Sequence, residues 1–286
     1  MSDRFARPLR IGWFATGLGT GSRALLTAAQ EAIARGSLHA EIPFMFCNRE
    51  PGEHENSDLL LALAGRYGIP TVTLSDRRFR RRVGGEIARA GRPLPAWRLA
   101  YDRAVLDLIA PYESDLGMLA GYMLIFGAEA CARYNFLNLH PAAPGGPIGT
   151  WQRVIWQLID QRAEESGVLI NRAIPAVDEG PVVAYCRYSL RGPELAPLWR
   201  AIGDRSAEDL RAAEGEELPL FKAIRAAGVT REIPLMVQTL VALAQRRVWL
   251  ADGVPHTAEG AITGGLDLTP EVEAAVRGWA RGKGQS

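Results

Sequence analysis

Three compact apolar segments alternate with two amphipathic ones near the start of the chain, and this alternation constrains the fold more than any other feature. Residues 9–15, 41–47 and 71–74 are predicted strands, and residues 24–34 and 58–67 are predicted helices. A strand–helix–strand–helix–strand order is typical of a parallel sheet with helices on both faces. The sequence therefore predicts an α/β fold with a Rossmann-like, mostly parallel sheet.

A glycine-rich turn joins the first predicted strand to the first predicted helix. Backbone N–H groups at such a helix N-terminus can bind an anion, and the turn adds hydroxyls and a positive charge. The predicted phosphate-binding residues are Gly19, Thr20, Gly21, Ser22 and Arg23. A tight turn without a ligand is the alternative, because the turn is no Walker loop and matches the dinucleotide fingerprint only loosely.

A second motif follows a short apolar run in the middle of the chain. Asn138 and His140 lie two residues apart at the end of the run, and a loop rich in proline and glycine follows. Alternation along a strand places both side chains on the same face. The amide can donate to a carbonyl oxygen that gains negative charge, and the imidazole can move a proton near neutral pH. For this tripeptide alone, a half-buried strand with a capped end is the better explanation.

Asp178 is the third candidate. It lies in the turn 177–181, after a predicted strand at residues 168–174. If that strand pairs with the strand of His140, the carboxylate can reach the imidazole, raise its pKa and select its tautomer. By itself the turn is an ordinary one.

Together these motifs resemble the folate-dependent formyltransferases of the glycinamide ribonucleotide formyltransferase family. That family carries Asn-x-His-Pro, followed some tens of residues later by Asp-x-Gly-Pro. The segments that match are Asn138-Leu139-His140-Pro141 and Val177-Asp178-Glu179-Gly180-Pro181, with further likenesses at Gly19–Ser22, Leu119–Met123 and Arg98–Asp102. The resemblance extends over roughly residues 9–190.

The resemblance implies a formyltransferase fold and transfer of a formyl group from 10-formyltetrahydrofolate, as co-substrate, to a primary amine. Glycinamide ribonucleotide, an intermediate of purine biosynthesis, is the first expected acceptor. Catalysis would fall to Asn138, His140 and Asp178, without a metal. The folate would contact Arg98, Met123, Leu124, Ile125 and Phe126, and Arg98 would meet its glutamate tail.

Departures from the family pattern leave the acceptor open. Leu124 stands where an arginine is usual, Asn171 where a histidine is frequent, and Trp151 near the place of another histidine. Arg23 replaces a common asparagine. The alternatives are a formyltransferase acting on an amino sugar or an amino-acid-derived metabolite, and a catalytically silent folate- or nucleotide-binding relative.

Charge and cysteine content narrow the expected partners and location. With 33 basic and 32 acidic residues the net charge is +1, which favours neither nucleic acid nor a membrane surface. Three widely spaced cysteines form no disulfide framework, so we expect a cytoplasmic protein with small-molecule substrates; a homodimer stays open. Residues 77–82 hold five arginines, which form either a solvated helix face or an anion-attracting patch.

The last third of the chain is less informative. We expect a catalytic domain at residues 1–190 and a helical extension at residues 191–286 packed on it. Within the extension, a helix is predicted from about Glu232 to Arg246, followed by a hairpin or loop up to Gly265. We expect no tRNA-binding barrel, because the extension lacks a run of alternating strands, and we expect no regulatory module before Leu9. The first expectation argues against a methionyl-tRNA formyltransferase, and the second argues against a formyltetrahydrofolate hydrolase.

Overall fold

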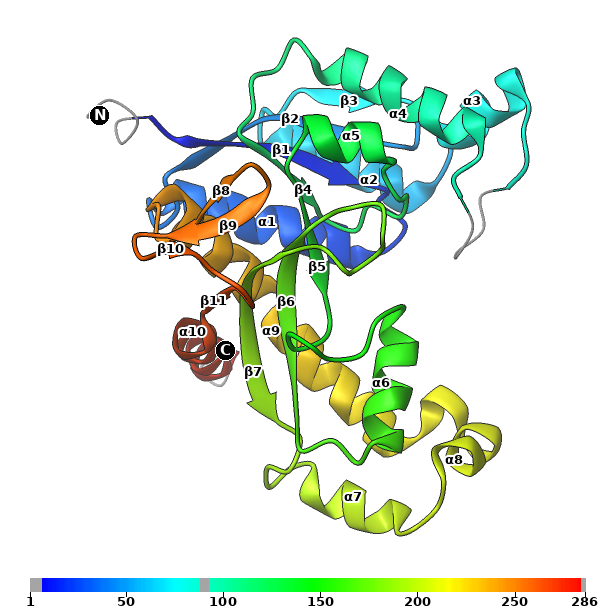
Figure 1. The fold of residues 1–286 in the computed structure, drawn as a ribbon, viewed down its shortest axis with the longest axis vertical. Helices are drawn as coiled ribbons and strands as arrows, with labels where there is room; N and C mark the ends of the chain where they lie inside the picture. Colours follow the sequence, from blue (N-terminus) through cyan, green and yellow to red (C-terminus); the bar gives the residue numbers. More distant parts are fainter. Residues whose placement is uncertain (1–6, 88–92, 284–286) are drawn as a thin grey trace.

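The computed structural model describes residues 7–87 and 93–283 and contains one main sheet with helices on both faces (Figure 1). The elements of the amino-terminal half are β1 (Leu9–Ala15), α1 (Thr20–Ala34), β2 (Ala40–Cys47), α2 (Glu55–Arg66), β3 (Thr71–Thr73), α3 (Asp76–Val83), α4 (Ala96–Ile109), β4 (Leu116–Leu119), α5 (Ala128–Arg133) and β5 (Phe136–His140). Those that follow are α6 (Trp151–Asp160), β6 (Glu165–Arg172), β7 (Val182–Ser189), α7 (Ala196–Ile202), α8 (Ala207–Ala213), α9 (Pro219–Ala244), β8 (Trp249–Ala251), β9 (Val254–Thr257), β10 (Gly260–Ala261), β11 (Leu266–Asp267) and α10 (Thr269–Lys283).

The main sheet has the strand order β11-β7-β6-β5-β4-β1-β2-β3. Strands β3, β2, β1, β4 and β5 run parallel, β6 is antiparallel to both β5 and β7, and β11 is parallel to β7. The predicted mostly parallel α/β fold is therefore confirmed.

Strand β1 lies between β2 and β4, and this position creates a switch in strand order. The chain moves outward from β1 through β2 to β3 and then returns to the other side of β1 with β4. The loops that leave β1 and β4 therefore diverge from the same carboxyl edge of the sheet. Open α/β sheets bind ligands at such a point.

Alternation along the strands divides the core between the two faces of the sheet. Ile11, Trp13 and Ala15 of β1 join the larger cluster, which includes residues of α1 and α9. Phe14 faces the other way, into a cluster that we call the aromatic cluster: Phe14, Phe44, Phe46, Phe79, Trp97, Tyr101, Tyr122, Phe126 and Phe136, with aliphatic neighbours from α4 and α5. In Figure 1, α5 lies in front of the sheet and α9 behind it.

The carboxyl-terminal part differs from the sequence prediction. Helix α9 begins at Pro219 and continues through Pro234, so the predicted start near Glu232 is wrong. Buried side chains lie on both sides of the proline, among them Phe221 and Ile224 before it and Leu235 and Leu240 after it. Their burial against the sheet stabilises one long helix and outweighs the local effect of a helix-interior proline.

The extension is also less purely helical than expected. The predicted hairpin is present as the antiparallel strands β8, β9 and β10, and β11 joins the main sheet beside β7. Residues of α9 and α10 belong to the same core cluster as β1, β6 and β7. No helix in the described part of the chain is both long and apolar enough to span a membrane.

Candidate active site

Strand β5 carries two of the three predicted catalytic residues. Phe136 of the same strand lies in the aromatic cluster, and alternation places Asn138 and His140 on that same face. His140 is 3% exposed, whereas Asn138 is half-buried. The strand ends at His140, and the loop of residues 141–150 then leads to α6.

Asp178 reaches these two side chains from the loop that joins β6 to β7. The Asp178 Oδ1 accepts a hydrogen bond from Asn138 Nδ2 over 3.1 Å, and its Oδ2 lies 3.3 Å from His140 Nδ1. Asp178 has a left-handed backbone, φ 62°. Nearby, a Cβ on Gly180 would lie 1.7 Å from the Arg172 carbonyl oxygen, so the loop's path requires glycine there. The amide, imidazole and carboxylate predicted from sequence therefore converge.

Both ring nitrogens of His140 have acceptor partners. Nδ1 faces Asp178, and Nε2 lies 3.0 Å from the carbonyl oxygen of Pro147. Burial is the strongest influence and lowers the pKa of His140. The hydrogen bonds to Asp178 and Pro147 and the charge of Asp178 together outweigh it, so the pKa is raised above its ordinary value. This geometry favours the imidazolium, which donates at both nitrogens.

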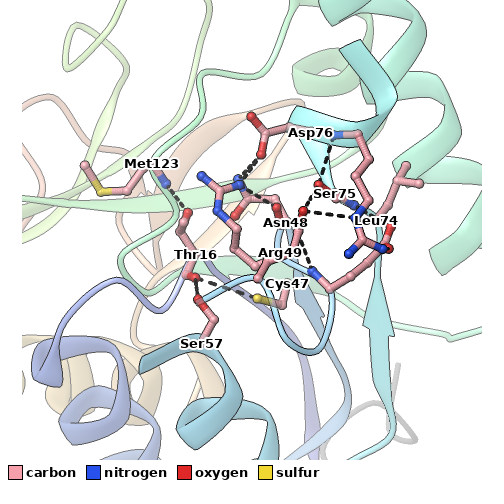
Figure 2. A network of polar contacts seen from close by, with 12 residues as sticks. Thr16, Cys47, Asn48, Arg49, Ser57, Leu74, Ser75, Asp76 and Met123 are labelled. Carbon is pink, nitrogen blue, oxygen red and sulfur yellow. Dashed lines mark hydrogen bonds and ion pairs between the residues drawn. The ribbon is translucent and has the colours of Figure 1, made fainter. Parts of the chain in front are cut away.

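Thr16, at the end of β1, connects the loops of the switch point (Figure 2). Its Oγ1 accepts from the backbone N–H of Met123, on the loop after β4, over 2.9 Å. Its carbonyl oxygen accepts from the Ser57 hydroxyl of α2 over 2.8 Å. The two predicted ligand loops are therefore tied together at the carboxyl edge of the sheet.

The predicted phosphate-binding turn forms the first turn of α1. Gly19 is the N-cap residue and has no side-chain cap, and Gly19, Thr20 and Gly21 are exposed. The backbone N–H groups of this turn are therefore free to meet an anion. Ser22 is only 7% exposed, and a Cβ on Gly121 would lie 2.4 Å from its Oγ, so its hydroxyl faces the neighbouring loop.

Arg23 already has a protein partner. Its Nη1 donates to the side-chain oxygen of Asn56 over 2.9 Å and lies 3.3 Å from the carbonyl oxygen of the same residue. The guanidinium is thus held beside the turn, where part of its surface stays accessible. Phosphate binding by this turn stays a prediction.

Exposed apolar side chains surround the predicted folate loop. Met123 is 67% exposed and Ile125 36% exposed, and Val177, next to Asp178, is 44% exposed. Leu124 is half-buried. Such side chains fit a flat, largely apolar ligand. Phe126 does not contribute to this surface, because it is 3% exposed and stacks on Phe136 with ring centroids 4.1 Å apart.

Arg98 lies in a different environment from the one that the resemblance implies. It is 1% exposed, forms an ion pair with Asp102 over 3.1 Å and donates to the Ile125 carbonyl oxygen over 2.7 Å. Asp102 in turn accepts from the Gly127 backbone N–H over 2.7 Å. The arginine holds the predicted folate loop from inside, and its guanidinium is buried within the protein.

Burial of the Arg98–Asp102 pair also shifts the pKa of the Asp102 carboxyl group. Burial raises the pKa of Asp102 to about 6, and the charge of Arg98 and the Gly127 hydrogen bond oppose that rise. Removing only one partner of such a pair destabilises the protein, because the other charge is then buried without a partner. The pair therefore stabilises the loop between β4 and α5.

A polar network that sequence reasoning missed lies beyond the end of β2 (Figure 2). Arg49, 6% exposed, forms an ion pair with Asp76 of α3, and Asn48 donates to the same carboxylate. From α3, Arg78 pairs with Glu50. The available signal was the run of polar residues directly after a buried strand at the carboxyl edge. Through this network, Asp76 and Arg78 of α3 connect the start of the arginine-rich stretch to the residues that follow β2.

Asn171 on β6 was noted in the sequence only as a departure from the family pattern. It is 1% exposed and pairs across the sheet with Asn138.

Over the described residues, no three His, Cys, Asp or Glu side chains gather closely enough to hold a metal ion.

Comparisons with known proteins agree with this architecture. The formyl transferase family matches residues 16–189, and no curated protein matches the sequence. A phosphoribosylglycinamide formyltransferase from Coxiella burnetii, solved with CHES, is 18% identical with a TM-score of 0.62, over 91% of this chain and 99% of that one. A glycinamide ribonucleotide transformylase from Symbiobacterium toebii is 18% identical with a TM-score of 0.57, over 88% and 95%. A formyltetrahydrofolate deformylase from Burkholderia mallei is 20% identical with a TM-score of 0.55, over 87% and 69%.

Proposed function

Since this chain belongs to the formyl transferase family, we propose that it transfers the formyl group of 10-formyltetrahydrofolate to the primary amine of glycinamide ribonucleotide. The observation that carries the proposal is the convergence of Asn138 and His140 on the single carboxylate of Asp178, at 3.1 and 3.3 Å. Strand β5 and the loop between β6 and β7 supply these groups, and together they provide a donor to an oxyanion, an acid and a counter-charge.

The reaction forms a bond between the amine nitrogen and the formyl carbon, and it breaks the bond between that carbon and N10 of the folate. One proton leaves the amine and one reaches N10, so no redox change occurs. Asn138 donates one N–H of its amide to Asp178. The second N–H can donate to the formyl oxygen as that oxygen gains negative charge. Such a donor is worth about 3–4 kcal/mol in comparable sites.

His140 holds the proton for the departing N10. Its Nδ1–H is held by Asp178 and its Nε2–H is directed at the Pro147 carbonyl. The Nε2–H would leave that carbonyl to reach the substrate. A general acid of this kind contributes about 10²–10⁴-fold. Asp178 keeps the imidazolium charged and oriented without exchanging a proton itself.

The surrounding loops suit the two substrates. The exposed apolar side chains of Met123, Ile125 and Val177 lie on the two loops beside the reacting groups and would cover the folate ring. The uncapped start of α1 would bind the phosphate of the ribonucleotide. Holding both substrates in reactive geometry supplies about 7–11 kcal/mol of the barrier reduction.

A second candidate is formyl transfer to a different amine. The Ser22 hydroxyl faces Gly121 and Arg23 donates to Asn56, so two of the five side chains of the predicted phosphate turn are directed at other parts of the protein. An acceptor without a phosphate would need neither side chain. The catalytic trio would act in the same way on an amino sugar or an amino-acid-derived amine.

One assay separates these activities. The protein is incubated with 10-formyltetrahydrofolate and glycinamide ribonucleotide, with a panel of amino sugars and amino-acid amides, or without an acceptor, and tetrahydrofolate is followed by absorbance. Turnover with glycinamide ribonucleotide supports the proposal, and turnover only with another amine supports the second candidate. Equal folate release without any acceptor would make the protein a hydrolase and contradict both. Absence of release in every mixture would indicate a silent relative.

A further inference from the structure

Asn171 lies directly beside the reacting groups on the neighbouring strand. In the antiparallel pairing of β5 and β6 it is opposite Asn138, and Leu169 is opposite His140. Residues opposite each other project from the same face of a sheet, with Cβ atoms about 4.5–5.5 Å apart. Packing agrees with this assignment, because Ile170 belongs to the core on the other face whereas Ala173 packs on the aromatic cluster.

The amide of Asn171 is buried with an unused acceptor. The residue is 1% exposed, and its Oδ1 has no hydrogen-bond partner. A buried polar atom without a partner costs about 1–3 kcal/mol, and such atoms are rare enough in folded proteins to require a reason. The Asp178 carboxylate offers only acceptors. Asn138 donates one N–H to Asp178 and, in the proposed reaction, the other to the formyl oxygen. The unused oxygen therefore needs an N–H or O–H from another source.

The substrate that reacts on this face brings such a donor. The formyl carbon lies close to Asn138 when Asn138 donates to the formyl oxygen, so the attacking amine comes within reach of the next side chain on that face. His140, 3% exposed, and Asn171, 1% exposed, lie at similar depth on this face of the sheet. The pairing of β5 and β6 would thus bring the unpaired Oδ1 of Asn171 close to the attacking amine of the acceptor substrate.

We propose that Asn171 binds the attacking amine of the acceptor substrate by accepting one of its N–H groups at Oδ1. This inference rests on the proposed formyl transfer and adds the residue that recognises the nucleophile. A primary amine has two hydrogens: one leaves as the bond to the formyl carbon forms and the bond to N10 breaks, and the other remains in the product amide. Asn171 holds the hydrogen that remains, and it exchanges no proton itself.

The test compares Asn171→Ala with Ser166→Ala, using glycinamide ribonucleotide and its N-methyl counterpart, which has one N–H fewer. Ser166 is the matched control, because it is a polar residue of β6 that is 2% exposed and shares the opposite face with Val168 and Ile170. We expect Asn171→Ala to lower kcat/KM for glycinamide ribonucleotide about tenfold, with an unchanged dissociation constant for the folate donor. With the N-methyl acceptor the same substitution should change kcat/KM less than about twofold.

The outcomes separate this inference from the function on which it rests. If the wild type turns over glycinamide ribonucleotide and Asn171→Ala matches it, or if both acceptors lose the same factor, the inference is overturned and formyl transfer stands. If the wild type transfers formyl to neither acceptor, both are overturned. Asn171→Leu, which is close to asparagine in volume, serves as a second variant, and thermal melting shows that each variant is folded before its kinetics are compared.

Discussion

The substitution Asp178→Asn tests the mechanism most directly, because Asp178 maintains the positive charge of His140. The substitution keeps the shape of the side chain and removes the counter-charge that lies 3.3 Å from Nδ1. Both side chains are largely buried, with 4% and 9% exposure for His140 and Asp178, so solvent screens their interaction weakly. Without the charge of Asp178, burial would lower the pKa of His140 against a weaker opposing effect.

The expected size of the effect follows from the lost interaction. A hydrogen bond to a charged group is worth about 1.5–3 kcal/mol, which corresponds to a loss of about 10- to 160-fold in kcat. Because the imidazolium is the active form in the proposed mechanism, wild-type kcat should fall as the pH rises through the raised pKa of His140. In Asp178→Asn the same decline should begin at lower pH.

The pH dependence of stability should change in the same sense. A raised pKa in the folded protein stabilises it fully below the ordinary histidine pKa of about 6.5, and this contribution disappears as the pH rises through the folded value. Asp178→Asn should lose most of that pH-dependent part of the free energy of unfolding.

Three measurements check this prediction: pH profiles of kcat, urea denaturation at several pH values, and titration of the His140 ring protons by NMR. Glu179→Gln is the matched control, since it removes a negative charge from an exposed side chain of the same turn. An alkaline decline of kcat at the same pH in wild type and Asp178→Asn would refute the assigned role of the carboxylate.

The other predictions concern the neighbouring loops. Gly180→Ala should lower the free energy of unfolding by about 2–4 kcal/mol, because its Cβ would meet the Arg172 carbonyl oxygen at 1.7 Å. Urea denaturation beside Gly192→Ala, which has open space around it, checks this, and equal stability of the two variants would contradict it. Arg23→Ala should raise KM for glycinamide ribonucleotide about tenfold with little change in kcat; Arg35→Ala, at the far end of α1, is the kinetic control, and an unchanged KM would exclude the contact.

Much of the fold could be predicted from the chain because its signals are local. The apolar run of β1, the glycine turn and the amphipathic α1 follow one another directly, and their periods of two and 3.6 residues specify a strand and a helix. The polar pair Asn138 and His140 also lies within one strand, so alternation alone places both on one face. Pro234 shows the limit of such reasoning, because a local helix breaker was overridden by burial on both sides of it.

The contacts of the site depend on distant parts of the chain. Nothing near Arg98 in the sequence reveals that Ile125 supplies an acceptor that holds it in the core. The position of Asn171 opposite Asn138 depends on the register of two strands joined by a long connection, and register is decided by packing across the whole sheet.

The sequence by itself determined which chemical groups are available: an amide and an imidazole two residues apart, a carboxylate on a later turn, and a glycine-rich helix start. These follow from residue identity and short-range periodicity. Only the tertiary structure decided which of them meet, which arginines are buried, and that a second amide lies beside the first. Such proximity arises from pairing and packing between segments far apart in the chain, and their energies are collective properties of the folded core.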